Sequence, residues 1–295
     1  MDLYIQVLVS GLLLGGVYAL ISVGLNLIFG VVRIINFAHG EMVMIAMYLT
    51  FWLHHFSKLD PYVSAIVIMP VMFIFGIVFQ RIVVQPILAT SATMKIFATV
   101  GVSLLLQNLA LIAWKGDFRT VQTSYSMSSL EVFDIIVSIP RLVAFSAALL
   151  SIIVLYYFLK YTYVGKALRA IVEDHAVARL MGVNVEKHYI LAFGMGTMFT
   201  ALGGVLLMPF SSVYPTVGVT FTLLAFVVVV LGGLGSMSGT FFAGLFIGVV
   251  ESIGGTFVSP ALKEAIYFAI FVLVLLVRPQ GLFGKGKGSE EVGLK

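Results

Sequence analysis

Several stretches of about twenty residues in this chain contain almost no charged side chain. Residues 143–159 (VAFSAALLSIIVLYYFL) are one example, and 265–277 (AIYFAIFVLVLLV) are uncharged throughout. A helix needs about twenty consecutive apolar residues to cross a bilayer core about 30 Å thick. Only 10% of the 295 residues are charged, whereas a soluble domain carries about 25%. We therefore expect an integral membrane protein that crosses the bilayer several times.

The hydrophobic pattern is that of helices, because the alternating ten-residue segments of membrane β-barrels are absent. We predict an all-α, polytopic transmembrane bundle of about eight or nine membrane helices, some of them short or broken. The predicted helices cover residues 4–29, 37–53, 62–80, 94–113, 141–159, 189–209, 219–233, 240–257 and 262–277. Glycine runs such as 232–235 and 244–248 lie within or between them, and favour either tight helix packing or local unwinding along a path.

Basic side chains fall mostly in one set of the connections between these helices. With the N-terminus outside, twelve of the 17 lie inside: Arg33, Arg81, Lys95, Lys160, Lys166, Arg169, Arg179, Lys187, Arg278, Lys285, Lys287 and Lys295. The other five are Lys58, Lys115, Arg119, Arg141 and Lys263. Cytoplasmic loops of membrane proteins carry the excess of Lys and Arg. We expect the N-terminus outside and the C-terminus in the cytoplasm, with the first span retained because MDLYIQ lacks the basic region of a signal peptide.

Two of the connections are long enough to have structure of their own. The outer one, 114–140, is polar with alternating Val, Ile and Phe, which predicts a small hairpin. The inner one, at about 160–188, has apolar residues at helical spacing between charged ones, which predicts short amphipathic helices, and Gly182 is expected to end them. This loop is either a surface helix without a partner or a docking helix for a cytoplasmic protein. The chain is thus expected to form one transmembrane domain over 1–285, with a cytoplasmic tail at 286–295.

The segment RIINFAHGE (33–41) is the densest polar cluster beside the spans. Asn36, His39 and Glu41 lie within six positions between two apolar helices. Polar groups near the membrane usually face a cavity or a partner, so the three are candidates for a translocation path or inner gate. The alternative is a helix start, with Asn36 as its N-cap and Glu41 in its first turn. His39 and Glu41 do not share a helical face, because they are two positions apart.

Three further polar side chains within the spans, Asn26, Gln107 and Asn108, are expected to form hydrogen bonds between helices. Glu251, near the outer end of its helix, is assigned either to an outer vestibule or to packing.

Several functions are excluded or disfavoured by the sequence. The chain has no cysteine, so disulfides, thiolate metal sites and cysteine nucleophiles are absent. No metal-ligand spacing occurs, and basic loops at the membrane explain the net charge of +4 without nucleic acid. Because the five histidines lie at or outside the predicted helix ends, an intramembrane enzyme is disfavoured. An ion-coupled secondary transporter stays as the alternative in another class, although such proteins usually place charges near the midplane.

Three segments resemble the LivH-type permease subunit of branched-chain amino acid ABC importers, within a broader permease family. They are GLNLIFGVVRIINFAHGEMVMIAMY (24–48), VGKALRAIVEDHAVARLMGVNV (164–185) and GGLGSMSGTFFAGLFIG (232–248) with RPQGLFG (278–284). The chain has no phosphate-binding loop of the form GxxxxGK[ST], which agrees with a permease whose ATPase is a separate subunit. It is expected to be non-catalytic and to bind no cofactor, since ATP and Mg²⁺ belong to the partner subunits.

The resemblance implies that the inner loop is the coupling helix that inserts into the ATPase. ABC importers carry Glu-Ala-Ala in that helix, followed four residues later by Gly. Ala178 and Gly182 match the last Ala and the Gly, but Ala176 replaces the Glu, and Glu173 or Asp174 is expected to substitute for it. Arg169 lies on the same loop and is assigned to the same contact.

The resemblance also implies the partners and the place of the protein. The expected partners are a second homologous permease, two cytoplasmic ATPase subunits, an extracytoplasmic solute-binding protein and membrane lipid, in the bacterial inner membrane. The expected solutes are amino acids, of the branched-chain class, with other amino acids or urea and short amides as the alternative.

Overall fold

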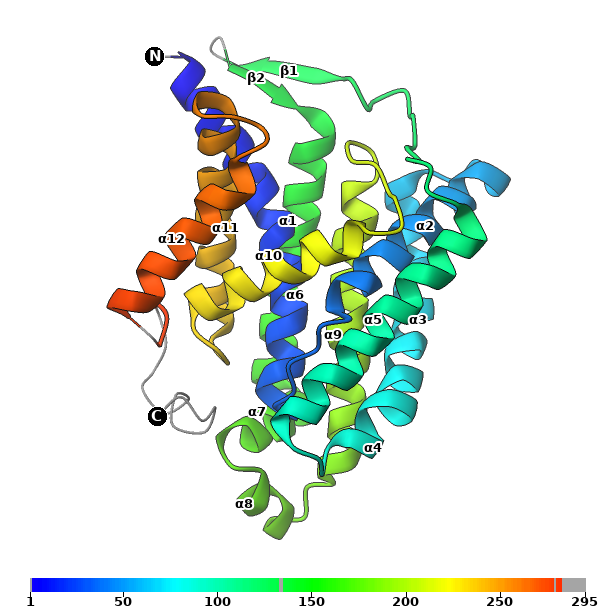
Figure 1. The fold of residues 1–295 in the computed structure, drawn as a ribbon, viewed down its shortest axis with the longest axis vertical. Helices are drawn as coiled ribbons and strands as arrows, with labels where there is room; N and C mark the ends of the chain where they lie inside the picture. The colour runs from blue at the N-terminus through cyan, green and yellow to red at the C-terminus, as the bar shows by residue number, and fades with distance from the viewer. Residues whose placement is uncertain (1, 133–134, 279, 283–295) are drawn as a thin grey trace.

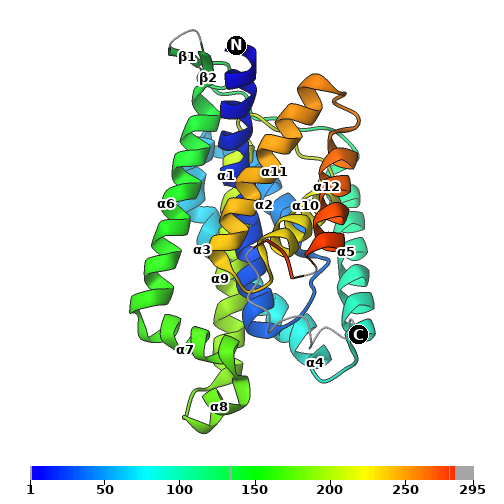
Figure 2. The same ribbon diagram turned by 90° about the vertical axis from the view of Figure 1, so that its left-hand side faces the viewer.

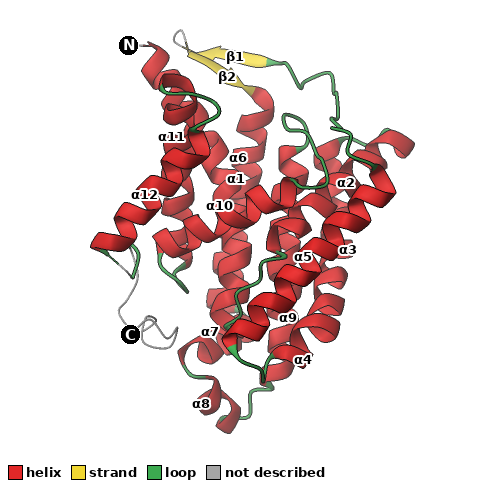
Figure 3. Cartoon of the chain, in the orientation of Figure 1, coloured by secondary structure: helices red, strands yellow, loops and turns green. Residues whose placement is uncertain are grey.

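The computed structural model is a bundle of helices, with one small hairpin at one end (Figures 1 and 3). The structure describes residues 2–132, 135–278 and 280–282. The tail predicted at 286–295, together with Lys285, Lys287 and Lys295, lies outside the described residues.

The first half of the chain holds α1 (Asp2–Val32), α2 (His39–Ser57), α3 (Pro61–Phe79), a π-helical turn η1 (Gln80–Val84), α4 (Gln85–Ile87), α5 (Ala92–Trp114), β1 (Ser129–Val132) and β2 (Ile135–Ser138). The second half holds α6 (Ile139–Tyr161), α7 (Tyr163–Glu173), α8 (His175–Leu180), α9 (Val185–Leu207), α10 (Val217–Gly232), α11 (Met237–Phe257) and α12 (Lys263–Val277).

The prediction of a polytopic helical bundle is confirmed. In the part of the chain that the structure describes, six segments are long and apolar enough to cross a membrane: α1, the continuous stretch Pro61–Ile87, α5, α6, α9 and α11. The helices α10 and α12 contain 16 and 15 residues, so each is about 22–24 Å long and shorter than the bilayer core. Every predicted membrane helix is present, with its ends moved by a few residues.

The core of the bundle is built around α1 and α9. The membrane windows of both helices are mostly buried, whereas α5 and α6 expose most of theirs, and α6 stands at the periphery (Figure 2). Small residues let α1 and α11 approach closely, since a Cβ atom added at Gly248 would lie 2.5 Å from the backbone nitrogen of Gly15. The glycine run at 244–248 therefore serves tight packing, one of its two predicted roles.

The two ends of the bundle carry different structures. At the hairpin end, β1 and β2 pair antiparallel with Ser129 opposite Ser138, which confirms the hairpin predicted within 114–140. The opposite end carries α7 and α8, which form the loop that the resemblance assigns to coupling, and we call it the coupling-loop end (Figure 1).

One helix does not start at the depth in the membrane that the sequence predicts. The second helix was expected to begin at a connection on the membrane surface, but residues 33–38 turn back into the bundle. His39, the first residue of α2, contacts the backbone oxygen of Ile21 at 3.1 Å, and Ile21 lies 11 residues inside the end of α1. At 1.5 Å per residue, α2 begins about 16 Å from that end. Arg33, with a φ of 55°, makes the turn.

Candidate functional site

The polar segment 33–41 lies inside the bundle, where α2 meets α1, α5, α9 and α10. The side chains of Asn36, His39 and Glu41 are all 0% exposed. The structure therefore places all three predicted path residues together, but at depth and not at the inner membrane surface. The membrane-surface placement was wrong because it assumed that a short connection between two spans stays in water.

His39 binds the central helices of the core. Its Nε2 lies 3.1 Å from the Ile21 oxygen on α1 and 3.1 Å from Thr200 Oγ1 on α9. Because a carbonyl oxygen can only accept, Nε2 carries the proton of the neutral ring, and Nδ1 is then an acceptor. The ring thus fixes the start of α2 against the two most buried helices.

Glu41 points to a different neighbour, as its spacing from His39 predicts. Its Oε1 accepts hydrogen bonds from Ser103 Oγ and Gln107 Nε2, both on α5 and both at 2.9 Å. The other carboxyl oxygen lies over Gly218, where an added Cβ atom would come within 2.6 Å of the Glu41 carboxyl carbon. Glu41 therefore lies between α5 and the first turn of α10.

The start of α10 lies directly against the start of α2. Thr222 Oγ1 accepts a hydrogen bond from Gly40 N at 2.9 Å and lies 3.3 Å from the oxygen of Phe37. A Cβ atom at Gly40 would lie 2.5 Å from both the nitrogen and Oγ1 of Thr222, so only glycine permits this approach. The N-terminal ends of two short helices thus meet within the bundle.

Asn36 does not cap α2. The N-cap position belongs to Ala38, which makes no side-chain cap bond. Asn36 Oδ1 accepts instead from the backbone nitrogen of Ala38 at 3.0 Å, which shapes the turn that precedes the helix. The helix-start interpretation is therefore wrong for Asn36, whereas Glu41 does lie in the first turn of α2.

Each of the three side chains keeps one buried polar atom without a hydrogen-bond partner among the described residues. These atoms are Asn36 Nδ2, a donor, and His39 Nδ1 and Glu41 Oε2. Leaving a buried polar group unpaired costs about 1–3 kcal/mol, so such groups need a reason. Together they offer a donor and two further polar atoms to a polar solute or to a rearranged neighbour.

The coupling loop forms two short helices, as predicted. In α7, Ala167, Leu168 and Ile171 are buried against the bundle. In α8 only Ala178 is buried, and the chain then turns at Gly182, whose φ is +83°, so the predicted helix stop is confirmed. The residues before that turn are exposed, with Leu180 at 86% and Met181 at 80%.

The charged residues of this loop have separate local partners. Arg169 donates from Nε to the Leu159 oxygen at 3.1 Å, and so fixes α7 to the end of α6. Asp174 caps α8 by accepting from Ala176 N at 2.8 Å and Val177 N at 3.0 Å. These backbone N–H groups hold the pKa of Asp174 below its usual value. Glu173 is exposed at the end of α7.

A hydrogen bond joins the coupling loop to the buried segment. Arg33 Nη2 donates to the oxygen of Val172 on α7 at 3.2 Å. Arg33 is also the residue at which the chain turns back toward Asn36. The bond therefore joins α7 to the first residue of the segment that carries Asn36, His39 and Glu41.

Comparison with known proteins assigns the family. Residues 7–275 match the family model described as "Branched-chain amino acid transport system / permease component". The chain belongs to this family.

Relatives in the family match along nearly the whole chain. The high-affinity branched-chain amino acid transport system permease protein LivH of Salmonella typhimurium is 30% identical over 96% of both chains. BraD of Pseudomonas aeruginosa, which carries the same description, is 29% identical over 96% of both chains. The ribose import permease protein RbsC of Haemophilus influenzae is 30% identical over 42% of this chain and 41% of its own. No solved structure matches the chain.

Family membership makes the chain a multi-pass transport permease component, so the buried polar segment is a candidate part of a transport path.

Among residues 2–132, 135–278 and 280–282, no group of three or more His, Asp or Glu side chains could hold a metal ion.

Several residues of the site carried no distinctive signal in the sequence. Thr200, Thr222 and Ser103 are hydroxyl residues within apolar helices, and only the fold brings them to 33–41. The prediction of interhelical hydrogen bonds is confirmed for Gln107, and for Asn26, which donates to Thr240 Oγ1 at 2.9 Å. It is wrong for Asn108, which donates to the Leu104 oxygen in its own helix.

Proposed function

We propose that this chain is a non-catalytic transmembrane subunit of an ABC importer in the bacterial inner membrane. Its solutes are amino acids, of the branched-chain class. Two cytoplasmic ATPase subunits bind and hydrolyse ATP with Mg²⁺, a second homologous permease completes the path, and an extracytoplasmic solute-binding protein delivers the solute. The coupling-loop end faces the cytoplasm, and the N-terminus lies outside.

The family match supports the transport role, and the exposed end of α8 supports the ATPase contact. Leu180 and Met181 expose most of their surface at the tip of the loop, beside the capping carboxylate of Asp174. Exposed apolar residues rimmed by polar ones are typical of protein interaction sites. We assign the contact with the ATPase to this tip, with Glu173, Asp174, Ala178 and Gly182 forming its frame and Arg169 anchoring it to α6.

The observation that carries the coupling mechanism is the hydrogen bond from Arg33 to Val172. When an ATPase displaces α8 and α7, the pull reaches residues 33–38 through this bond. The segment ends at the start of α2, where Asn36, His39 and Glu41 keep unpaired polar atoms. In the proposed cycle these atoms face the path in one state and are occluded in the other, which is how an alternating-access transporter moves a polar solute.

The test separates coupling from assembly. The chain is reconstituted into liposomes with its partner permease, ATPases and binding protein, and leucine uptake is measured with ATP hydrolysis. We expect Arg33→Gln to lower uptake per ATP hydrolysed, because the bond to α7 is lost. Arg81→Gln is the matched control, since Arg81 is an exposed cation at the same end.

Two outcomes would contradict the proposal. Equal uptake per ATP in the Arg33 and Arg81 variants would remove the coupling role of that bond. Uptake driven by an ion gradient without ATP would indicate a secondary transporter. Competition by urea, short amides and other amino acids, with each matched binding protein, identifies the solute class.

A further inference from the structure

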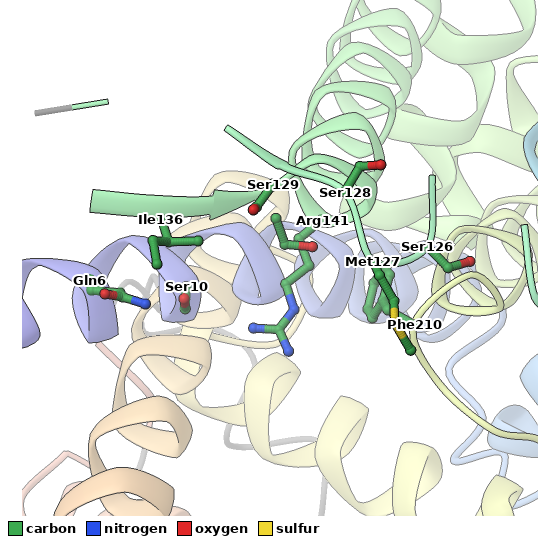
Figure 4. A pocket seen from close by; sticks show the side chains of 10 residues that line it. Gln6, Ser10, Ser126, Met127, Ser128, Ser129, Ile136, Arg141 and Phe210 are labelled. Atoms are coloured by element: carbon green, nitrogen blue, oxygen red, sulfur yellow. The ribbon is translucent and has the colours of Figure 1, made fainter. Parts of the chain in front are cut away.

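A second polar site lies at the hairpin end, far along the chain from the buried segment. A cavity of about 340 Å³ opens between the start of α1, the 126–129 turn, the start of α6 and Phe210. Its lining includes serine hydroxyls, the Gln6 amide and the Arg141 guanidinium (Figure 4). Small-molecule sites begin at about 300 Å³, so the cavity has room for one small solute.

The charge of this cavity comes from one residue. Arg141 is the only charged side chain among the lining residues, and no hydrogen bond or ion pair is found for it within the described residues. Its guanidinium carbon lies 5.9 Å from the centre of the Phe210 ring. A guanidinium is permanently charged and presents a fork of donors that matches a carboxylate. Within residues 2–132, 135–278 and 280–282, the site therefore has an anion-binding group without an ion-pair partner.

The walls of the cavity are fixed by their own hydrogen bonds. Tyr62 Oη donates to the Pro140 oxygen at 2.8 Å, directly before Arg141. Tyr125 Oη donates to Asp60 Oδ2 at 2.6 Å, directly before Ser126. Burial and this carboxylate raise the pKa of Tyr125, so the phenol stays protonated and keeps its bond. A site held in place before the ligand arrives loses less entropy when it binds.

An acidic group lies deeper at the same end. Glu251 is 6% exposed, its Oε1 accepts from Lys263 Nζ at 2.7 Å, and its Oε2 has no partner among the described residues. Because Glu251 is paired with Lys263 and does not line the cavity, the charge of the cavity itself comes from Arg141.

We propose that this cavity is an entry subsite that recognises the carboxylate of an amino acid, with Arg141 as the carboxylate-binding residue and the hydroxyls of Ser10 and Ser129 as further donors. This inference rests on the proposed function for the solute class. It assigns to the permease itself a step of solute recognition, separate from the polar segment at 33–41.

The absence of cysteine from the chain allows a direct test without transport. Ser128→Cys introduces one thiol into the cavity lining of the full chain in lipid nanodiscs. We measure the rate at which this thiol reacts with a neutral maleimide in the presence of one of three compounds: leucine, 4-methylpentanoate or leucinamide. Of the two analogues, 4-methylpentanoate keeps the carboxylate without the ammonium, and leucinamide lacks the carboxylate. Ser57→Cys, an exposed position at the same end, is the control site.

We expect leucine and 4-methylpentanoate to slow labelling at position 128 but not at position 57. Leucinamide should slow labelling at neither position. Adding Arg141→Gln should weaken this protection at least about tenfold, the loss expected for one charge-assisted hydrogen bond. Lys115→Gln, which removes an exposed cation at the same end, should leave the protection by leucine unchanged. The ratio of labelling by an anionic to a cationic methanethiosulfonate should also fall at least about twofold in Arg141→Gln, as for a unit charge about 8 Å away in water.

Each other result overturns the proposal. Equal protection by leucinamide would show that the carboxylate is not recognised, and no protection up to the solubility of leucine would show that the cavity is not an amino acid site. Protection only by added solute-binding protein, lost in Arg141→Gln, would make Arg141 a docking contact for an acidic side chain of that protein. Because the assay does not depend on ATP or uptake, carboxylate protection without leucine transport would separate failure of the proposed function from failure of this site.

Discussion

The closest test of the buried site is the substitution Gly40→Ala at the crossing of α2 and α10. An added Cβ atom would lie 2.5 Å from Thr222 N and Oγ1, whereas ordinary contacts begin at 3.4 Å. The two helix starts would have to separate by at least about 0.9 Å. Because one of these atoms belongs to the backbone, a side-chain rotation cannot relieve the overlap. Overpacking of this kind costs about 1–3 kcal/mol.

The matched control for this prediction is Gly101→Ala on α5, where an added Cβ atom meets nothing within 4 Å. Alanine in a helix is more stable than glycine by about 0.5–1 kcal/mol, so this variant should unfold at the same or a higher temperature. With about 2–4 °C for each kcal/mol, we expect the thermal midpoint of purified Gly40→Ala to fall by about 2–12 °C. If the two variants unfold at the same temperature, α2 and α10 do not cross as described.

Four further predictions follow from the site and the coupling loop. Glu41→Gln and Asn36→Ala should lower uptake per assembled complex if the buried segment lines the path; normal uptake at matched expression would leave it a structural element. Gly182→Val should reduce coupled ATP hydrolysis while the chain still inserts, because valine does not readily adopt the positive φ of 83° found there; unchanged coupled hydrolysis would count against the role of the loop. Thiols introduced by Ser126→Cys and Ala170→Cys should label from opposite sides of the membrane, the first from outside and the second only after permeabilisation; labelling of both from one side would refute the orientation. Since the pKa of Asp174 is lowered in the folded loop, its stabilising effect on α8 is complete above the ordinary value of 3.8 and is lost as the pH falls through the lower folded pKa. Protection of the Ala176 and Val177 amides from hydrogen exchange, relative to the intrinsic exchange rate at each pH, should fall there, and unchanged protection would contradict the cap.

The helices could be predicted from the sequence because hydropathy alone defines them. The predicted 141–159 and the observed Ile139–Tyr161 differ by two residues at each end, since an uncharged run leaves little choice inside a bilayer. The hairpin and the turn at Gly182 were predictable for similar reasons, as alternation and glycine are local signals.

The depth of the polar segment could not be predicted in this way. Local sequence shows that residues 33–38 break the helix, but not that they return into the bundle. The return depends on Thr222 and Gly218 on α10, against which the start of α2 packs. Gly40 and its hydrogen-bond partner Thr222 are 182 residues apart in the sequence. Arg141 was counted only as one of five outer cations, because its cavity is formed by segments that are distant in the sequence.

The return of residues 33–38 into the bundle has a consequence for biogenesis. His39 and Gly40 find their partners Thr200 and Thr222 161 and 182 residues later in the chain. At a synthesis rate of about 5–20 residues per second, those partners emerge roughly 8–36 s after the segment itself. During that interval α1 offers the segment only the Ile21 oxygen. Its other polar groups have to be satisfied by water, which keeps the segment at the membrane surface. The start of α2 is therefore among the last parts of the chain to reach its final depth, and its burial completes only after α9 and α10 have been inserted.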